Sequence, residues 1–236
     1  MTIALVDVVK YYSGVIHQKQ ALLRLQQQIE SANSALLADD SEFARLWRNQ
    51  AAVESDLLIT SDGIGPAKIG TTYGQIKQAL GPEYTFSDVE SFMVDLSAVA
   101  VLREGISGFF GGQAIAFYLV YDEGTTLTDN TQIDLFITSN PNYQTAEGTG
   151  PGTLLANAVR DYGNITLGFN SEAELREFAR FERTPANLDF RVEALTHGFA
   201  GDYSVPDAVR NGSSNQTSAF FENASISQVW VRGDLP

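Results

Sequence analysis

A pattern of Gly-x-Gly-Pro followed by a short helical stretch occurs twice in the chain, and it constrains the fold more than any other feature. The first copy runs from Gly63 to Phe86 and the second from Gly148 to Phe169. Each copy continues with an apolar stripe at helical spacing, a glycine that ends the helix and a run typical of a strand. Because one such stripe is too narrow to form a core, each helix is expected to pack on antiparallel strands of its own copy.

Local signals place the two helices. In the first copy, Thr72 followed by Gln75 matches a capping box, and Gly81 with the proline after it ends a helix that we expect from Thr72 to Leu80. Its buried stripe is expected at Tyr73, Ile76 and Leu80. The helix of the second copy is expected from Thr153 to Tyr162, with Gly163 after it. Its stripe is expected at Leu155, Ala158 and Tyr162.

Short apolar runs bounded by Gly, Pro and Asn predict strands from Leu57 onwards. These runs are MVDLSAVAVL, AIAFYLVY, IDLFITS, NITLGF, LDFRV and ISQVWV. The run SEAELREFARFERTPANLDFRV carries competing helix and strand patterns, and we expect helix or turn in its first half and strand in its second.

The residues before Leu57 contain few turn signals and many good helix formers. Two amphipathic stretches there, with Leu22, Leu25 and Ile29 in the first and Trp47 in the second, predict a helical hairpin that docks on the rest of the chain or on a partner. The sequence therefore predicts an α+β protein: an N-terminal helical hairpin followed by two repeated modules of short helix plus antiparallel sheet. The expected boundaries are 1–55, 56–145 and 146–236.

The stretch GIGPAKIGTTYGQIKQALG resembles the Gly-Met-Thr-x-x-x-Val-x-x-x-Leu-Gly signature of the outer-membrane assembly lipoproteins and the related β-lactamase-inhibitor-protein fold. The matching residues are Gly70, Thr71, Ile76, Leu80 and Gly81, and the signature's methionine is missing here. The resemblance covers the helical start of each half. It implies tandem α+β repeats that present a concave sheet face to a protein partner, and it brings no catalytic residues with it.

The N-terminal run YYSGVIHQKQALLRLQQQI followed by FARLWRN is similar to a helical segment of bacterial cell-wall hydrolases and peptidoglycan-binding proteins. The residues that carry this similarity are Tyr11, Tyr12, His17, Gln18, Ala21, Leu22 and Trp47. The similarity implies a cell-envelope setting.

Charge and composition exclude several classes of function. With 29 acidic and 15 basic residues the net charge is −14, which repels a polyanion such as DNA. The absence of cysteine excludes disulfides and thiolate sites. We expect no membrane span, because no apolar run approaches the roughly 18 residues that one needs. The first residues lack a secretory signal, so a cytoplasmic location is expected, or the cell envelope if a targeting segment was removed.

Catalysis is not expected, nor is a metal or another cofactor. The two histidines, His17 and His197, are far apart in sequence and have no clear nucleophile beside them. The acidic residues near the expected hairpin turn do not match a calcium loop; they are Asp122, Glu123, Asp129 and Asp134. An enzyme that uses carboxylates as acid and base is a third alternative, with Glu90, Asp95 and Glu104 as its candidates.

Binding is the function that the sequence favours. Arginine and aromatic side chains are typical of protein interfaces. The candidates are Arg176, Arg180 and Arg183 in the ambiguous run, Phe109 and Phe110 in a glycine-rich segment, and Tyr11, Tyr12 and Trp47 near the N-terminus. We expect a noncatalytic scaffold or adaptor that binds another protein in a larger bacterial assembly, with the N-terminal helices as a second docking element. The alternative is a glycan-binding protein that associates with peptidoglycan through exposed aromatic rings.

Overall fold

The computed structural model describes residues 55–93, 96–104, 113–171, 175–194 and 198–233. The chain divides into two compact units, Met1–Val53 and Glu54–Pro236, and the described residues all belong to the second. The helical hairpin expected before Leu57 therefore falls almost wholly outside the described part of the chain.

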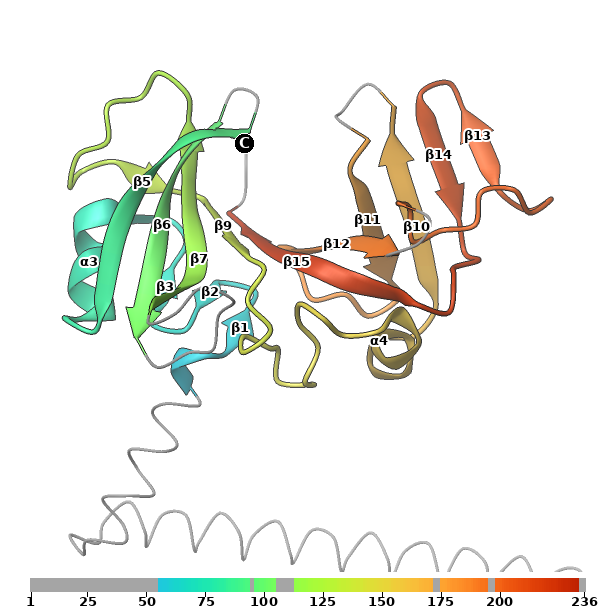
Figure 1. Cartoon of the computed structure of the whole chain (residues 1–236), viewed down its shortest axis with the longest axis horizontal. Helices are drawn as coiled ribbons and strands as arrows, with labels where there is room; N and C mark the ends of the chain where they lie inside the picture. Colours follow the sequence, from blue (N-terminus) through green and yellow to red (C-terminus); the bar gives the residue numbers. More distant parts are fainter. Residues whose placement is uncertain (1–54, 94–95, 105–112, 172–174, 195–197, 234–236) are drawn as a thin grey trace, which may run out of the picture. The chain divides into compact units, whose positions relative to one another are not determined.

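Strands dominate the described residues (Figure 1). Ten of them form one antiparallel sheet, in the order β13 (Val209–Asn211), β14 (Ser214–Thr217), β10 (Ile165–Asn170), β11 (Glu177–Phe181), β12 (Leu188–Ala194), β15 (Ala224–Arg232), β9 (Leu135–Thr138), β7 (Gln113–Asp122), β6 (Leu96–Glu104) and β5 (Tyr84–Met93). The short strands β1 (Ile59–Thr60), β2 (Gly63–Ile64) and β3 (Ala67–Lys68) form a second sheet, and β4 (Thr71–Thr72) pairs with β8 (Gln132–Ile133).

The two helices are α3 (Tyr73–Leu80) and α4 (Leu155–Tyr162). The predicted capping box is confirmed: the Gln75 backbone N–H donates to Thr72 Oγ1 at 3.4 Å, and the Thr72 N–H donates to Gln75 Oε1 at 2.9 Å. Both helices end at a glycine with positive φ, as expected. The expected stripe residues are buried at Ile76, Leu80, Leu155, Ala158 and Tyr162 and partly buried at Tyr73.

The predicted α+β fold class is wrong. Each helix is followed by a three-strand meander, β5–β7 or β10–β12, but these strands do not form separate sheets. Strand β9 pairs with β15, which joins both sets into one large antiparallel sheet, so the described part is mostly β. The physical reason is that pairing satisfies the backbone groups of two strands that would otherwise be exposed edges. The first half of the ambiguous run, expected as helix or turn, is corrected in part: Ser171 and Leu175 lie in turns, but Glu177–Phe181 forms β11.

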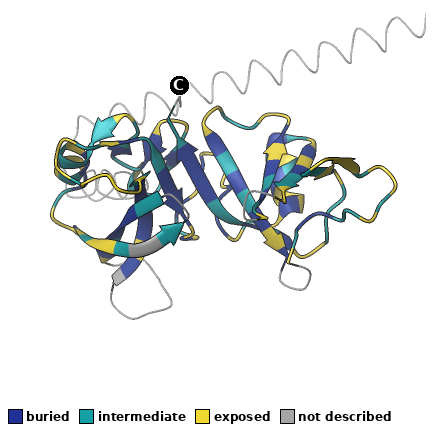
Figure 2. Ribbon diagram, turned by 90° about the horizontal axis from the view of Figure 1, so that it is seen from above, coloured by how far each residue is buried: buried dark blue, intermediate teal, exposed yellow. Residues whose placement is uncertain are grey.

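The large sheet has two different faces. One face joins α3 and α4 in a single large apolar core, which includes Phe117, Phe136, Phe190 and Val229 from the sheet. A smaller apolar cluster, separate from this core, includes Val120 and Trp230. Figure 2 shows the central strands as mostly buried, with exposed residues gathered in the loops. We call the side of the sheet away from the two helices the open face.

Candidate binding surface

Strand alternation places charged and aromatic side chains on the open face. In β12 the residues Leu188, Phe190 and Val192 belong to the large core, so Asp189 and Arg191 point to the other side. In the antiparallel register, Arg191 lies opposite Phe178 of β11 and Gln228 of β15, and Asp189 lies opposite Trp230. Three adjacent strands therefore present these residues together.

Trp230 is the centre of this group, with only 3% of its surface exposed. The ring of Phe178 meets it edge-on at 5.1 Å between centroids. The guanidinium groups of Arg176 and Arg232 lie 5.6 and 4.9 Å from the centre of its ring, within range of a cation–π interaction. The indole N–H donates to Gln228 Oε1 at 3.0 Å. We call Arg176, Phe178, Arg191, Trp230 and Arg232 the arginine–tryptophan cluster.

The three arginines of the cluster influence one another. Arg191 Nη1 donates to Gln228 Oε1 at 3.2 Å, the same oxygen that accepts from Trp230. Arg232 forms an ion pair with Asp189, with 2.5 Å between Nε and Oδ2. Burial, together with the positive charges of Arg191 and Arg232, lowers the pKa of Arg176. Three guanidinium groups therefore gather around one aromatic ring, and Asp189 offsets the charge of one of them, Arg232.

Apolar side chains continue across the open face from Trp230. Ala98, Val120 and Ile137 are buried there. Half-buried apolar side chains pack around them: Val89, Phe92, Met93, Leu96, Tyr118, Leu135 and Phe178. Phe92 and Tyr118 contact one another with 4.9 Å between ring centroids. The half-buried rings leave apolar surface that a partner could cover.

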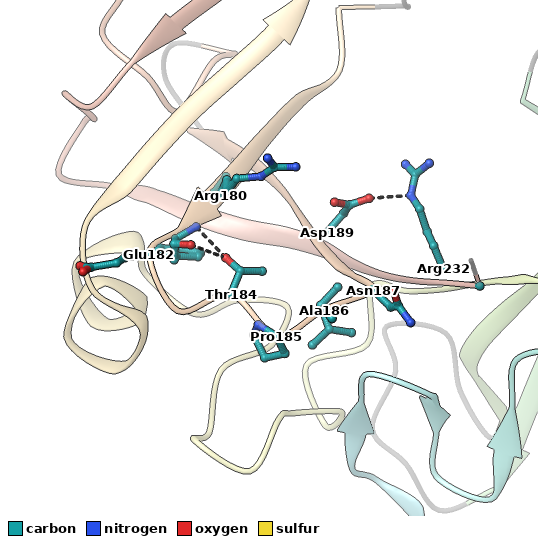
Figure 3. Close-up of a pocket in the computed structure, with 12 residues that line it drawn as sticks. Arg180, Glu182, Thr184, Pro185, Ala186, Asn187, Asp189 and Arg232 are labelled. Carbon is teal, nitrogen blue, oxygen red and sulfur yellow. Dashed lines mark hydrogen bonds and ion pairs between the residues drawn. The ribbon is translucent and has the colours of Figure 1, made fainter. Parts of the chain in front are cut away.

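Two hollows adjoin the cluster. The first, of about 370 Å³, is lined by Leu96, Leu135, Arg176, Trp230 and Arg232, with Asp122 and Asp134 also in its wall. The second, of about 570 Å³, lies at the turn between β11 and β12. Figure 3 shows Arg180, Asp189 and Arg232 extending to the same side of the ribbon there. Arg232 lines both hollows, so the two adjoin the same charged surface.

The structure separates the three arginines that the sequence analysis selected. Arg176 belongs to the cluster, and Arg180 lines the neighbouring hollow. Arg183 lies elsewhere, where its Nη2 donates to the backbone oxygen of Asp161 at the end of α4, at 3.1 Å. The other selected residues lie outside the described part of the chain: Tyr11, Tyr12, Trp47, Phe109 and Phe110.

The candidates for catalysis are not brought into one described site. His17, His197 and Asp95 lie outside the described residues, and Glu104 is exposed at the end of β6. Within the described ranges, no group of three or more His, Asp or Glu side chains is arranged to hold a metal ion. The helices in those ranges are also too short or too polar to cross a membrane.

Sequence reasoning missed Trp230 and Arg232 as site residues. The alternation of Gln228, Trp230 and Arg232 in one strand could have placed the last two on a common face. Their proximity to Arg176 depends on the pairing of β12 with both β11 and β15, which no local pattern encodes.

Comparisons with known proteins found no matching family model, no matching curated protein and no matching solved structure. The resemblance to outer-membrane assembly lipoproteins and to the β-lactamase-inhibitor-protein fold therefore stays a prediction.

Proposed function

We propose that the unit at residues 54–236 is a noncatalytic protein-binding module whose partner covers the open face at the arginine–tryptophan cluster. The observation that carries the proposal is the composition of this face. Tryptophan, tyrosine and arginine are the residue types that contribute most to protein interfaces, because they combine large contact area with directional bonds. Here the half-buried Tyr118 and Arg176 lie on the face that α3 and α4 leave open, and Arg176 lies over the ring of Trp230, which is itself buried.

A purely structural role for the arginines accounts for less of this arrangement. Arginine stems can shield a tryptophan ring from water, and one cation over Trp230 would serve that purpose. Two guanidinium groups lie over the ring, a third lies beside it on Arg191, and hollows open next to them. Shielding of one ring does not require this concentration of arginine beside open hollows, whereas a surface that a partner covers is typically rich in arginine.

The glycan-binding alternative has no described residue in its favour, because Tyr11, Tyr12, Trp47, Phe109 and Phe110 all lie outside the described ranges. The docking predicted through the N-terminal helices also has no described residue in its favour, because those helices lie outside the described ranges. Both stay predictions.

Site-specific photo-crosslinking in the native host tests the proposal. A benzophenone amino acid replaces Tyr118, which is half-buried on the open face, and in a matched control it replaces Asn157, which is exposed on α4. We expect a discrete protein adduct at position 118, identified by mass spectrometry, that is absent at position 157 and lost when Arg176→Glu is added. Identical adducts at both positions, or no protein adduct at position 118, would contradict the proposal. An adduct to glycan strands would favour the peptidoglycan alternative.

A further inference from the structure

We infer that Asn211 is a site of spontaneous covalent modification, at which the side-chain amide nitrogen is lost as ammonia and the residue becomes aspartate or isoaspartate. This inference does not depend on the proposed function, because it concerns the hairpin of β13 and β14 and not the arginine–tryptophan cluster.

The sequence around Asn211 supplies the reacting groups. Asn211 is followed by Gly212, and this is the single Asn-Gly pair in the chain. The backbone nitrogen of Gly212 attacks the side-chain carbonyl carbon of Asn211, a C–N bond forms, and the amide nitrogen leaves as ammonia. Because glycine has no Cβ, it hinders the approach of its own nitrogen less than any other residue does.

Water completes the reaction by opening the five-membered succinimide that the attack forms. Opening at one carbonyl group gives aspartate, and opening at the other gives isoaspartate, in which the main chain runs through the side-chain methylene. Each product carries a carboxylate where Asn211 carries an amide, so the net charge of the chain becomes −14 − 1 = −15. Water is the one co-reactant, and no group is oxidised or reduced.

The structure leaves both reacting groups accessible. Asn211 lies opposite Ser214, so Gly212 and Ser213 form a two-residue turn between β13 and β14. A glycine with positive φ at the first position is typical of such a turn, and Gly212 has a φ of 60°. Asn211 and Gly212 are both exposed, and β13 is the outermost strand of the large sheet. Among the described residues, neither the side chain of Asn211 nor the N–H of Gly212 takes part in a hydrogen bond.

Two other asparagines show what protects a side-chain amide. Asn157 is also exposed, but it lies on α4, where the N–H of Ala158 donates to the backbone oxygen of Leu154 at 3.2 Å. Asn215 lies in β14, which is paired with β13 on one side and with β10 on the other. The backbone nitrogen after either residue can attack only when the helix or the sheet opens locally. Asn211 is therefore expected to react first.

The two products differ in their effect on the hairpin. Aspartate keeps the ordinary main chain, so β13 can still pair with β14. Isoaspartate adds a methylene to the main chain directly before the turn, where the backbone oxygen of Ser213 accepts from the N–H of Ser171 at 2.9 Å. The isoaspartate form is therefore expected to loosen the attachment of this turn to the residue that follows β10.

Peptide mapping of the full chain tests the inference. The protein is incubated at physiological temperature in mildly alkaline buffer, and its proteolytic peptides are followed by liquid chromatography and mass spectrometry. We expect Asn211 to convert to two products with time. Asn157 and Asn215 should convert at least about tenfold more slowly, because the structure around them must open first.

Two variants and one enzyme identify the products. Asn211→Gln keeps an exposed amide but would have to close a larger ring, so it should stay unmodified over the same period. Asn211→Asp provides a standard for the aspartate product. The other product should accept a methyl group from protein isoaspartyl methyltransferase. Circular dichroism establishes that both variants are folded.

A synthetic peptide of residues 205–218 gives the rate for the same sequence without the fold. Conversion of Asn211 in the folded chain at more than about one tenth of the peptide rate would support the inference. Slower conversion would mean that the hairpin prevents the attack, and it would overturn the inference. Equal rates at Asn211, Asn157 and Asn215 would also overturn it, because the turn would then have no particular reactivity.

Discussion

Trp230 of β15 lies directly opposite Ile137 of β9 in the antiparallel register. This pair lies on the junction where β5, β6, β7 and β9 meet β15, β12, β11 and β10. The large core extends across the same junction, since Phe117 and Phe136 come from one side of it and Phe190 and Val229 from the other. Neither set of strands has a core of its own, so residues 54–236 are expected to fold as one cooperative unit.

The first prediction is that the chain cannot be divided between residues 145 and 146. A fragment 54–145 would lack β15, the neighbour of β9, and a fragment 146–236 would lack β9. Each fragment should therefore show little NMR dispersion, whereas intact 54–236 should unfold in urea in one transition. Far-UV circular dichroism and the fluorescence of Trp230 should give the same midpoint. Independent cooperative unfolding of either fragment would show that the junction is dispensable.

The second prediction concerns the helix stripes. Leu80 and Tyr162 are 1% and 3% exposed, so replacing either by alanine leaves a cavity and should lower the free energy of unfolding by about 2 to 4 kcal/mol. The exposed Gln78→Ala on α3 serves as the control and should change it by less than about 0.5 kcal/mol. Urea titration measures all three variants. A decrease in unfolding free energy for Leu80→Ala no larger than that for Gln78→Ala would mean that α3 is not part of the core.

The hydroxyl of Tyr162 makes a separate, third prediction. It lies 2.6 Å from Thr145 Oγ1 and donates to Glu147 Oε2 at 2.7 Å, and this hydrogen bond lowers the pKa of Glu147. In Tyr162→Phe the pKa of Glu147 should rise toward its ordinary value, which NMR titration of the carboxyl carbon would detect. A hydrogen bond from Thr145 also lowers the pKa of Glu147, but less than that from Tyr162, so Thr145→Ala should raise this pKa by less than Tyr162→Phe does. An unchanged pKa in Tyr162→Phe would assign the shift to another group.

What the sequence could predict was local. The capping box of Thr72 and Gln75, the glycine ends of both helices and the buried stripes depend on residues within a few positions of one another, and all were found. Strand β11 was missed because charged residues alternate with aromatic ones there. The buried positions include Glu177, which a hydrophobic pattern counts as exposed.

Long-range pairing explains the remaining errors. The repeat predicted two sheets, one in each copy. The structure has a single large sheet instead, because β9 and β15 pair although about ninety residues separate them. The binding cluster depends on the same kind of information: Arg176 was selected from its local run, but Trp230 and Arg232 join it only through the sheet order. Composition alone gave no reason to select these two residues.

The fourth prediction follows from the buried carboxylate of Glu177, which is 3% exposed. Its Oε2 accepts from the backbone N–H of Ala200 at 2.5 Å, and its Oε1 accepts from the N–H of Gly201 at 2.9 Å and from the Tyr203 hydroxyl at 2.7 Å. Burial raises the pKa of Glu177 although these three donors oppose the shift. Glu177→Gln should cost about 1 to 3 kcal/mol near pH 5, because its amide nitrogen would face a backbone N–H donor.

The raised pKa of Glu177 determines how the difference in unfolding free energy between the wild type and Glu177→Gln depends on pH. Between the ordinary value near 4.5 and the higher folded value, the folded protein binds the proton of Glu177 more readily than the unfolded chain does. The contribution of Glu177 is therefore full below about pH 4.5 and declines as pH rises through the folded pKa. Urea denaturation of the wild type and Glu177→Gln from pH 4.5 to 8 should show the difference in unfolding free energy decreasing. Tyr203→Phe removes one donor to the carboxylate and so raises the folded pKa further, so the decline in that variant should extend to higher pH. A difference that grows with pH would mean that the three hydrogen bonds outweigh burial.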